Sequence, residues 1–290
     1  MLQYNYYERK GKNTMSFKIV TDSSADLTTL DGVAFESVPL KINTTEKEYV
    51  DNAELDVIGM LSDLKKYKGK SHSSCPNSEE YLRAFGDAEN VFCITITSGL
   101  SGSYNSAATA AKMYLEEHPD RKIHVIDSLS TGAENALVIY KLRDLILEGK
   151  DFEAVKTEII AYHDKVRLLF ALESMHNLAN NGRVSHLAAK MAGILGIRAI
   201  GRASDVGTLE MICKSRGIKS MIADIVNRLG LEGYKGGKIR IHHADNLSAA
   251  ETLKEKILEK YREAKVIIST TRGLCSFYAE AGGLLVGFEI

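Results

Sequence analysis

The chain has 290 residues, of which 44% are hydrophobic and 26% charged, and its formal net charge is -1 at pH 7. These proportions are typical of a soluble globular protein, and the length suits two domains. Basic residues are scattered among acidic ones, and no apolar run reaches the roughly eighteen residues that a membrane span needs. We therefore expect neither a nucleic-acid partner nor stable insertion into a membrane.

The first half of the chain alternates strand-like and helix-like segments. The strand-like runs cover residues 17–22, 34–42, 90–97 and 122–127, and the helix-like runs cover 55–67, 78–88 and 103–118. Such alternation predicts a parallel α/β sheet, whose ligand sites lie beyond the carboxyl ends of the strands. Three of the strands run into small polar loops, TDSS, TSGLSGS and DSLSTG, so hydroxyls and carboxylates should converge on one rim of the sheet.

The pattern changes from about Lys150. The expected helices cover residues 151–166, 174–196, 218–230 and 246–264, and the expected strands cover 166–172, 197–204, 208–215, 238–244 and 265–271. This order predicts a second, α+β domain. The predicted fold class is α/β, with an N-terminal parallel α/β domain over residues 16–165 and a C-terminal α+β domain over residues 166–290.

The four cysteines and the N-terminus indicate the cellular compartment. The cysteines show neither C-x-x-C pairing nor the spacing of a zinc site, and the first residues lack the apolar core of a secretion signal. We expect a cytoplasmic protein with no metal and no cofactor. Residues 1–15 are polar and Tyr-rich, and we expect them to lie outside the fold.

The loop in ITITSGLSGSYNSAATAA, residues 94–111, joins a strand to an Ala-rich helix and could hold one of three groups. A phosphate site is disfavoured, because neither G-x-x-x-x-G-K-[ST] nor G-x-G-x-x-G is present. A serine hydrolase could use Ser101, Asp127 and His243, which fall in the chain order of an α/β-hydrolase triad. The nucleophile motif G-x-S-x-G, however, ends here in Ser103 instead of glycine.

A carboxylate that is simply held is the third possibility. The backbone N–H groups at a helix start favour an anion, and the hydroxyls of Ser98, Ser101 and Ser103 can donate to it without adding charge. The plain alternative is that Ser98 only caps the following helix, which is the commonest role of a serine there. Composition alone leaves these two interpretations open.

Six segments spread over both predicted domains form a recognisable series. They are, in chain order, VTDSSADL, SSCPNSEEY, ITSGLSGSYNSA, NNGRVS, KSRG and HHADN. Together they resemble the DegV family of bacterial lipid-binding proteins, and the resemblance extends from about residue 17 to the C-terminus. It implies a two-domain DegV-like fold that binds one long-chain fatty acid, with the carboxylate at the strand-end loops and the acyl chain buried in the second domain. Some members are non-catalytic carrier subunits of a fatty acid kinase, so the catalytic subunit of such a kinase is a candidate partner.

The resemblance also implies roles for individual residues. Ser98 is the first candidate to donate to the carboxylate, and Ser73 or Ser74 the second. Tyr278 stands where the family has a histidine, so it offers one neutral O–H and no cation. The same alignment places Glu280 at a glycine of the family pattern, and Cys75 at its glutamine.

The apolar string from Leu187 to Ile200 is ordinary core by its composition. In a DegV-like domain, Met191, Ile194 and Leu195 would line the tunnel for the acyl chain. Arg216 is expected at the surface, where it could contact the kinase or an acyl phosphate.

Overall fold

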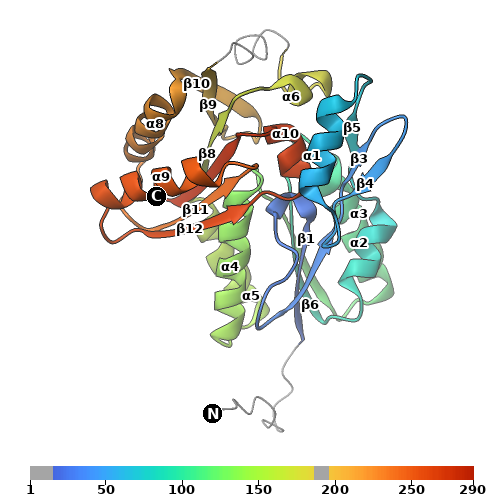
Figure 1. Ribbon diagram of the computed structural model, residues 1–290. Helices are drawn as coiled ribbons and strands as arrows, with labels where there is room; N and C mark the ends of the chain where they lie inside the picture. Colours follow the sequence, from blue (N-terminus) through green and yellow to red (C-terminus); the bar gives the residue numbers. More distant parts are fainter. Residues whose placement is uncertain (1–15, 186–195) are drawn as a thin grey trace, which may run out of the picture.

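The computed structural model describes residues 16–185 and 196–290, so the expectation for residues 1–15 and the predicted tunnel residues Met191, Ile194 and Leu195 lie outside the described part. Two large sheets with helices dominate the fold (Figure 1). The prediction of an α/β protein with a parallel sheet first and a sheet-and-helix part second is confirmed. Within the described ranges, none of the helices is long and apolar enough to cross a membrane.

The first sheet is parallel, with strand order β2-β1-β6-β7. Its strands are β1 (Phe17–Asp22), β2 (Ala34–Val38), β6 (Asn90–Thr95) and β7 (Lys122–Asp127). Helices α2 (Ser78–Phe85) and α3 (Ser103–Glu117) cover one face, and α4 (Ala133–Leu147) and α5 (Phe152–His163) cover the other. A short 3-10 turn, η1 (Ser23–Ala25), follows β1 directly.

A small antiparallel sheet, β4-β3-β5, lies beside this unit together with helix α1. Its strands are β3 (Lys41–Asn43), β4 (Glu48–Val50) and β5 (His72–Ser74), and the helix is α1 (Val57–Lys66). The single strand predicted over residues 34–42 was wrong, because it divides into β2 and β3 around Pro39. Proline has no N–H to donate and is disfavoured inside a sheet, so the chain leaves one sheet there and enters another.

The second large sheet has the order β10-β9-β8-β13-β11-β12 and is antiparallel except between β11 and β12. Its strands are β8 (Val166–Leu172), β9 (Ile197–Ala203), β10 (Leu209–Arg216), β11 (Lys238–His243), β12 (Lys265–Thr270) and β13 (Leu284–Glu289). Helices α8 (Gly217–Leu231) and α9 (Leu247–Lys260) pack on its outer face. The short helices α6 (His176–Asn180) and α10 (Gly273–Ala279) lie at its other side. Every described strand of this sheet begins at or after Val166, and the domain boundary at that point stays a prediction.

Helix α4 packs against both large sheets, since it contacts β1 and β6 of the first and β8, β11 and β13 of the second. The approach to β13 is close, because a Cβ at Gly287 would overlap the backbone of Ala133 and Glu134. The two sheets therefore share this buried helix, and the rest of the surface between them encloses the candidate site.

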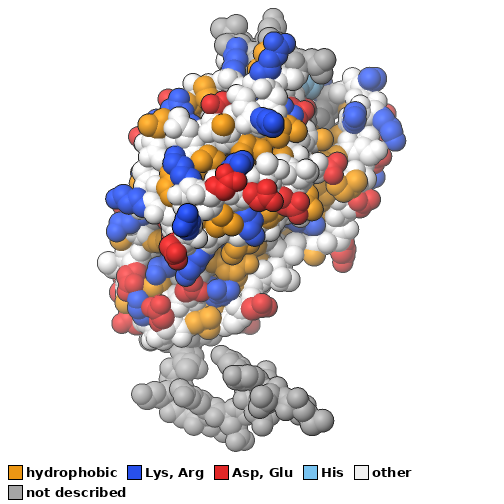
Figure 2. Space-filling model, turned by 60° about the vertical axis from the view of Figure 1, so that its left-hand side comes forward, with side chains coloured by type: hydrophobic (Ala, Val, Ile, Leu, Met, Phe, Trp, Pro, Cys, Tyr) orange, Lys and Arg blue, Asp and Glu red, His pale blue; other side chains and the backbone are white. Residues whose placement is uncertain are grey.

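On the surface face in Figure 2, basic and acidic side chains are interspersed.

Candidate functional site

The strand-end loops of the parallel sheet meet as the sequence predicts. Thr97 N donates to Ser130 O at 2.9 Å, and Gly132 N donates to Ser24 O at 2.7 Å. The loops after β1, β6 and β7 are thus hydrogen-bonded to one another at the carboxyl edge of the sheet. This edge faces the second sheet.

A fully buried carboxylate, that of Asp22, organises this edge. It accepts hydrogen bonds from Ser103 Oγ at 2.6 Å, from Ser24 Oγ at 2.5 Å and from Ile96 N at 3.0 Å. Burial raises the pKa of Asp22, while the hydrogen bonds from Ser103, Ser24 and the backbone oppose that rise. Because these donors come from the start of α3, from η1 and from the end of β6, Asp22 fixes the relative positions of three loops.

The backbone N–H groups of the hydroxyl-rich loop are largely taken by the protein itself. Ser98 N donates to Asp127 Oδ1 at 3.0 Å, Gly99 N donates to Thr97 Oγ1 at 3.1 Å, and Ser101 N donates to Thr97 O at 3.3 Å. A ligand at this loop would therefore rely mainly on donors from side chains.

The two glycines of the loop allow close packing. A Cβ at Gly99 would lie 2.8 Å from Gly207 O, and Thr97 Oγ1 donates to that same carbonyl at 2.9 Å. A Cβ at Gly102 would lie 3.2 Å from Cys75 Sγ. The TSGLSG sequence is thus suited to receive the β9–β10 turn from the second sheet, a role that the sequence alone did not reveal.

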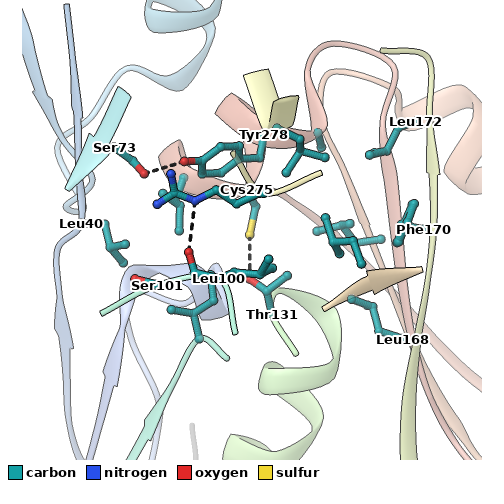
Figure 3. Close-up of a pocket in the computed structure, with 17 residues that line it drawn as sticks. Leu40, Ser73, Leu100, Ser101, Thr131, Leu168, Phe170, Leu172, Cys275 and Tyr278 are labelled. Atoms are coloured by element: carbon teal, nitrogen blue, oxygen red, sulfur yellow. Dashed lines mark hydrogen bonds between the residues drawn. The ribbon is translucent and has the colours of Figure 1, made fainter. Parts of the chain in front are cut away.

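Between the two sheets lies a pocket of about 650 Å³, counting its open mouth (Figure 3). Its wall is mostly apolar, with a few hydroxyls, one thiol and one guanidinium. The described residues that line it are Leu40, Ser73, Ile96, Leu100, Ser101, Thr131, Leu168, Phe170, Leu172, Leu178, Arg183, Leu209, Leu274, Cys275, Tyr278, Ala279 and Leu285. Among these residues, Arg183 is the one charged side chain.

The apolar part of the wall comes largely from β8. Leu168, Phe170 and Leu172 point toward the pocket, whereas Leu169 and Ala171 face the core under α8 and α9. Alternation along a strand sends successive side chains to opposite faces of a sheet, so one buried strand serves both the core and the pocket. The sequence predicts this strand but gives no sign that one of its faces lines a cavity.

The polar part of the wall centres on Tyr278 of α10 and Ser73 of β5. Their hydroxyl oxygens lie 2.7 Å apart in a hydrogen bond that either residue can donate (Figure 3). The guanidinium carbon of Arg183 lies 5.8 Å from the centre of the Tyr278 ring. Burial raises the pKa of Tyr278, although the Ser73 hydrogen bond and the positive charge of Arg183 oppose this, so the phenol is neutral at physiological pH.

Arg183 and Ser101 complete the polar part. Arg183 Nε donates to Leu100 O at 3.1 Å, which holds the guanidinium beside the hydroxyl-rich loop. Ser101 Oγ accepts from Ser103 N at 3.3 Å and lines the pocket. The sequence gives no sign that Arg183 lines a pocket, whereas it presents Ser101 both as a candidate nucleophile and, with Ser98 and Ser103, as a candidate donor to a carboxylate.

Two of the predicted residues, Ser73 and Tyr278, thus line the pocket. The other two serines lie elsewhere. Ser74 is exposed and accepts from Asn43 Nδ2 at 3.3 Å, because it follows Ser73 on a strand and so faces the opposite side. Ser98 is exposed and lies outside the described pocket wall. Arg216 is exposed at the end of β10.

The residues of the hydrolase hypothesis are not joined as a triad. Asp127 Oδ1 accepts from the backbone N–H groups of Ser98 and Leu129, and His243 Nδ1 accepts from Asn246 N at 3.2 Å. Within the described residues, no hydrogen bond connects Ser101 with His243 or His243 with Asp127.

Burial of Cys275 raises the pKa of its thiol far above the usual value, so this pocket residue is a neutral packing group. No group of three or more metal-ligating side chains occurs in the described ranges.

Comparison with known proteins adds to this geometry. The model of the DegV family, described as uncharacterised proteins, matches residues 16–289. The chain is 46% identical over 280 residues to a DegV domain-containing protein of Streptococcus pneumoniae (strain ATCC BAA-255 / R6), an alignment that covers 95% of this chain and 100% of the relative.

Solved structures similar to this chain include proteins loaded with fatty acids. The Fatty Acid Kinase (Fak) B3 protein of Streptococcus pneumoniae, loaded with linoleic acid, has 46% identity and a TM-score of 0.94, with 95% of this chain and 100% of that chain covered. A DegV family protein of Eubacterium eligens, loaded with heptadecanoic acid, has 44% identity and a TM-score of 0.93, with 94% and 99% covered.

Proposed function

The chain belongs to the DegV family, and from this membership and the pocket between its sheets we propose that it binds a long-chain fatty acid. The observation that carries the proposal is the composition of the described pocket wall, which is apolar except for hydroxyls, one thiol and a single cation. A fatty acid has the matching chemistry, with a long apolar chain and one carboxylate. The fatty-acid-loaded relatives of similar structure support this assignment.

We place the carboxylate near Ser73, Tyr278, Ser101 and Arg183. While the bond between Ser73 and Tyr278 is intact, one hydroxyl of that pair and the hydroxyl of Ser101 can donate hydrogen bonds, and the guanidinium supplies the compensating charge. Within the described wall there is no acidic side chain to compete for that charge. Ser98, the donor that the family resemblance suggests first, would have to act from outside this wall.

The acyl chain would lie against the inner face of β8, where Leu168, Phe170 and Leu172 meet Leu285 of β13. Burial of apolar surface contributes about 0.8 kcal/mol per methylene, so a chain of about sixteen carbons offers on the order of 10 kcal/mol before ordering costs. The chain thus supplies most of the affinity, and the polar residues fix the orientation of the headgroup. Residues Met191, Ile194 and Leu195 remain proposed contacts of the chain outside the described residues.

Mass spectrometry of the lipid extracted from purified protein tests this function. We expect roughly one fatty acid per chain, because an apolar pocket excludes water and is stabilised when filled. Delipidated protein should bind oleate more tightly than methyl oleate, which lacks the charge. Protein that yields only traces of lipid and takes up neither oleate nor palmitate would overturn the proposal.

We further propose that the bound carboxylate is presented to the catalytic subunit of a fatty acid kinase in the cytoplasm, with this chain as the non-catalytic carrier. The Fak B3 relative supports such a partner. Tyr278 provides a donor but no positive charge, so Arg183 is the one cation of the described pocket wall at this carboxylate, and a second cation at position 278 would further favour phosphoryl transfer. Arg216, exposed at the end of β10, is the proposed contact for the partner or the acyl phosphate.

A reconstitution with a kinase subunit and ATP tests the carrier role. We expect slow formation of acyl phosphate with the unchanged chain, faster formation with Tyr278→His, and loss with Arg216→Ala at unchanged oleate affinity. Turnover by the unchanged chain equal to that of Tyr278→His would contradict the argument from charge. Absence of acyl phosphate with either protein would contradict the carrier role while leaving fatty acid binding intact.

A further inference from the structure

Glu280 has a backbone conformation that side chains normally avoid. Its φ is 54° and its ψ is 170°, at the point where α10 ends. This region of backbone space is occupied almost entirely by glycine, and a residue with a Cβ stays there only when its surroundings compensate for the strain. A strained residue two positions from Tyr278 needs a physical reason.

The reason lies in the hydrogen bonds of its carboxylate. Glu280 Oε1 accepts from Ser174 Oγ at 2.9 Å and from Asn177 N at 3.1 Å. In the opposite direction, Asn177 Nδ2 donates to Phe277 O at 2.8 Å. These three bonds hold the segment that follows β8 against α10.

The same segment leads directly to Arg183. After helix α6, Arg183 N donates to Leu178 O at 2.8 Å, and Asn181 Nδ2 donates to Ser71 O at 3.2 Å. Arg183 therefore sits on a stretch anchored at one end by Glu280 and at the other by the chain just before β5, which carries Ser73. Its guanidinium lies over the ring of Tyr278.

We propose that Glu280 is a positioning residue for recognition of the carboxylate, an inference that rests on the proposed fatty acid binding. Glu280 does not line the described pocket wall, and it acts through the segments that carry Arg183 and Tyr278. By joining α6 to α10 it sets the distance between the cation and the phenol. A glycine at this position would relax the backbone but would release that connection.

The test compares oleate with oleyl alcohol, which has the same chain and no carboxylate. Glu280→Gly should bind oleate about tenfold or more weakly, the loss expected when hydrogen bonds to a charged group lose their geometry. Its affinity for oleyl alcohol should stay within about twofold of the unchanged protein, since the apolar wall is intact. Thermal stability without ligand is measured alongside, because relief of the strained backbone and loss of the hydrogen bonds from Ser174 and Asn177 act in opposite directions.

Further variants keep the test decisive. Glu280→Gln retains an oxygen that can accept from Ser174 and Asn177, so it should restore most of the oleate affinity. If Glu280→Gly fails to fold, Ser174→Ala removes one donor to Glu280 without changing the backbone at residue 280, and it should weaken oleate binding while sparing oleyl alcohol. Asp245→Gly is the matched control, because Asp245 also has a positive φ, 48°, but is exposed in the β11–α9 turn. It should leave both affinities unchanged.

Equal losses for oleate and oleyl alcohol in Glu280→Gly would overturn the inference, and so would unchanged oleate affinity. An equally weak Asp245→Gly would also overturn it, because the effect would then come from relaxing the backbone. If the unchanged protein binds oleyl alcohol as tightly as oleate, or binds neither, the proposed function itself fails, and this outcome is visible before any variant is made.

Discussion

Ser98 and Ser101 lie three residues apart on one loop, yet their hydroxyls have different surroundings. Ser101 lines the pocket, whereas Ser98 is exposed. We expect Ser101→Ala to weaken oleate binding by about 1–3 kcal/mol, the range for a hydrogen bond to a charged group, and Ser98→Ala to change it by less than about 0.5 kcal/mol. Titration calorimetry on the two delipidated variants measures both values. A larger loss of affinity for Ser98→Ala than for Ser101→Ala would show that Ser98 donates to the carboxylate, as the family resemblance suggests.

Glu134 provides a prediction about pH. Burial raises its pKa to about 7, although the hydrogen bond from Ser130 and the charge of Arg167 oppose the rise. The usual value is 4.5, so between about pH 4.5 and pH 7 the folded chain keeps a proton that the unfolded chain has released. The free energy of unfolding therefore falls as the pH rises through that window.

Glu134→Gln is neutral at every pH and should remove this dependence. We expect its free energy of unfolding, relative to that of the unchanged protein, to rise by on the order of 3 kcal/mol between pH 4.5 and pH 7. Urea unfolding of delipidated protein at several pH values checks this. Glu79→Gln is the control, because Glu79 also lies in the first turn of a helix but is exposed. If both variants change the pH dependence of the free energy of unfolding equally, burial of Glu134 is not the cause of that dependence.

Single residues of the site differ in how far the sequence can reveal them. Ser73 and Tyr278 are 205 positions apart, and only the family resemblance connects them before the structure shows their hydrogen bond. Arg183 is polar and follows a turn, so by itself it is indistinguishable from a solvated surface arginine. Its place in the pocket depends on contacts with Leu100 and Tyr278, which come from distant elements.

At the scale of elements, the parallel sheet was predictable and its surroundings were less so. Alternating segments indicate β1, β6 and β7 with their intervening helices, because each pattern is local. Helix α4 was not predicted. Its residues are buried around most of its circumference by the two sheets, so the apolar and polar faces that mark a surface helix are absent. β5 was missed as well, since its polar sequence becomes a strand only through pairing with β3.

Strand β8 gives a prediction at this scale, since its two faces have different roles. Phe170 lines the pocket and Leu169 packs in the core beneath α8 and α9. We expect Phe170→Ala and Leu169→Ala each to lower the free energy of unfolding by about 2–5 kcal/mol. Only Phe170→Ala enlarges the pocket, so the lipids extracted from it should shift toward longer or bulkier chains.

Mass spectrometry of the extracted lipids, together with urea unfolding, distinguishes the two faces. Leu169→Ala is the matched control, because it removes a buried side chain from the same strand without touching the pocket wall. If both variants show the same altered lipid profile, general loosening of the fold explains the change, and the assignment of the inner face of β8 to the acyl chain is wrong.

At the scale of the whole molecule, polar contacts join the two halves around the pocket. His242 Nδ1 and Asp26 Oδ2 are 2.8 Å apart and fully buried, and Arg272 N donates to Asp26 Oδ1 at 2.6 Å. Asp51 accepts from Gly273 N at 2.7 Å and keeps a raised pKa of about 6 because of its burial. If the halves separated, these hydrogen bonds would be lost together, and each contributes on the order of 1 kcal/mol, or more where a charged group takes part.

A ligand held between the two halves should therefore stabilise both. A ligand that binds only the folded state adds about 2.7 kcal/mol at a hundredfold excess over its Kd. We expect delipidated protein to unfold at a lower temperature in one transition, and added oleate to raise that transition as a whole. Hydrogen exchange should slow in the four-stranded and the six-stranded sheet alike.

Acetate is the control, since it has the carboxylate without the chain and should have almost no effect. Oleate that moves one of two separate transitions, or that protects a single sheet, would mean that the acyl chain lies within one half of the molecule and not in the pocket between them.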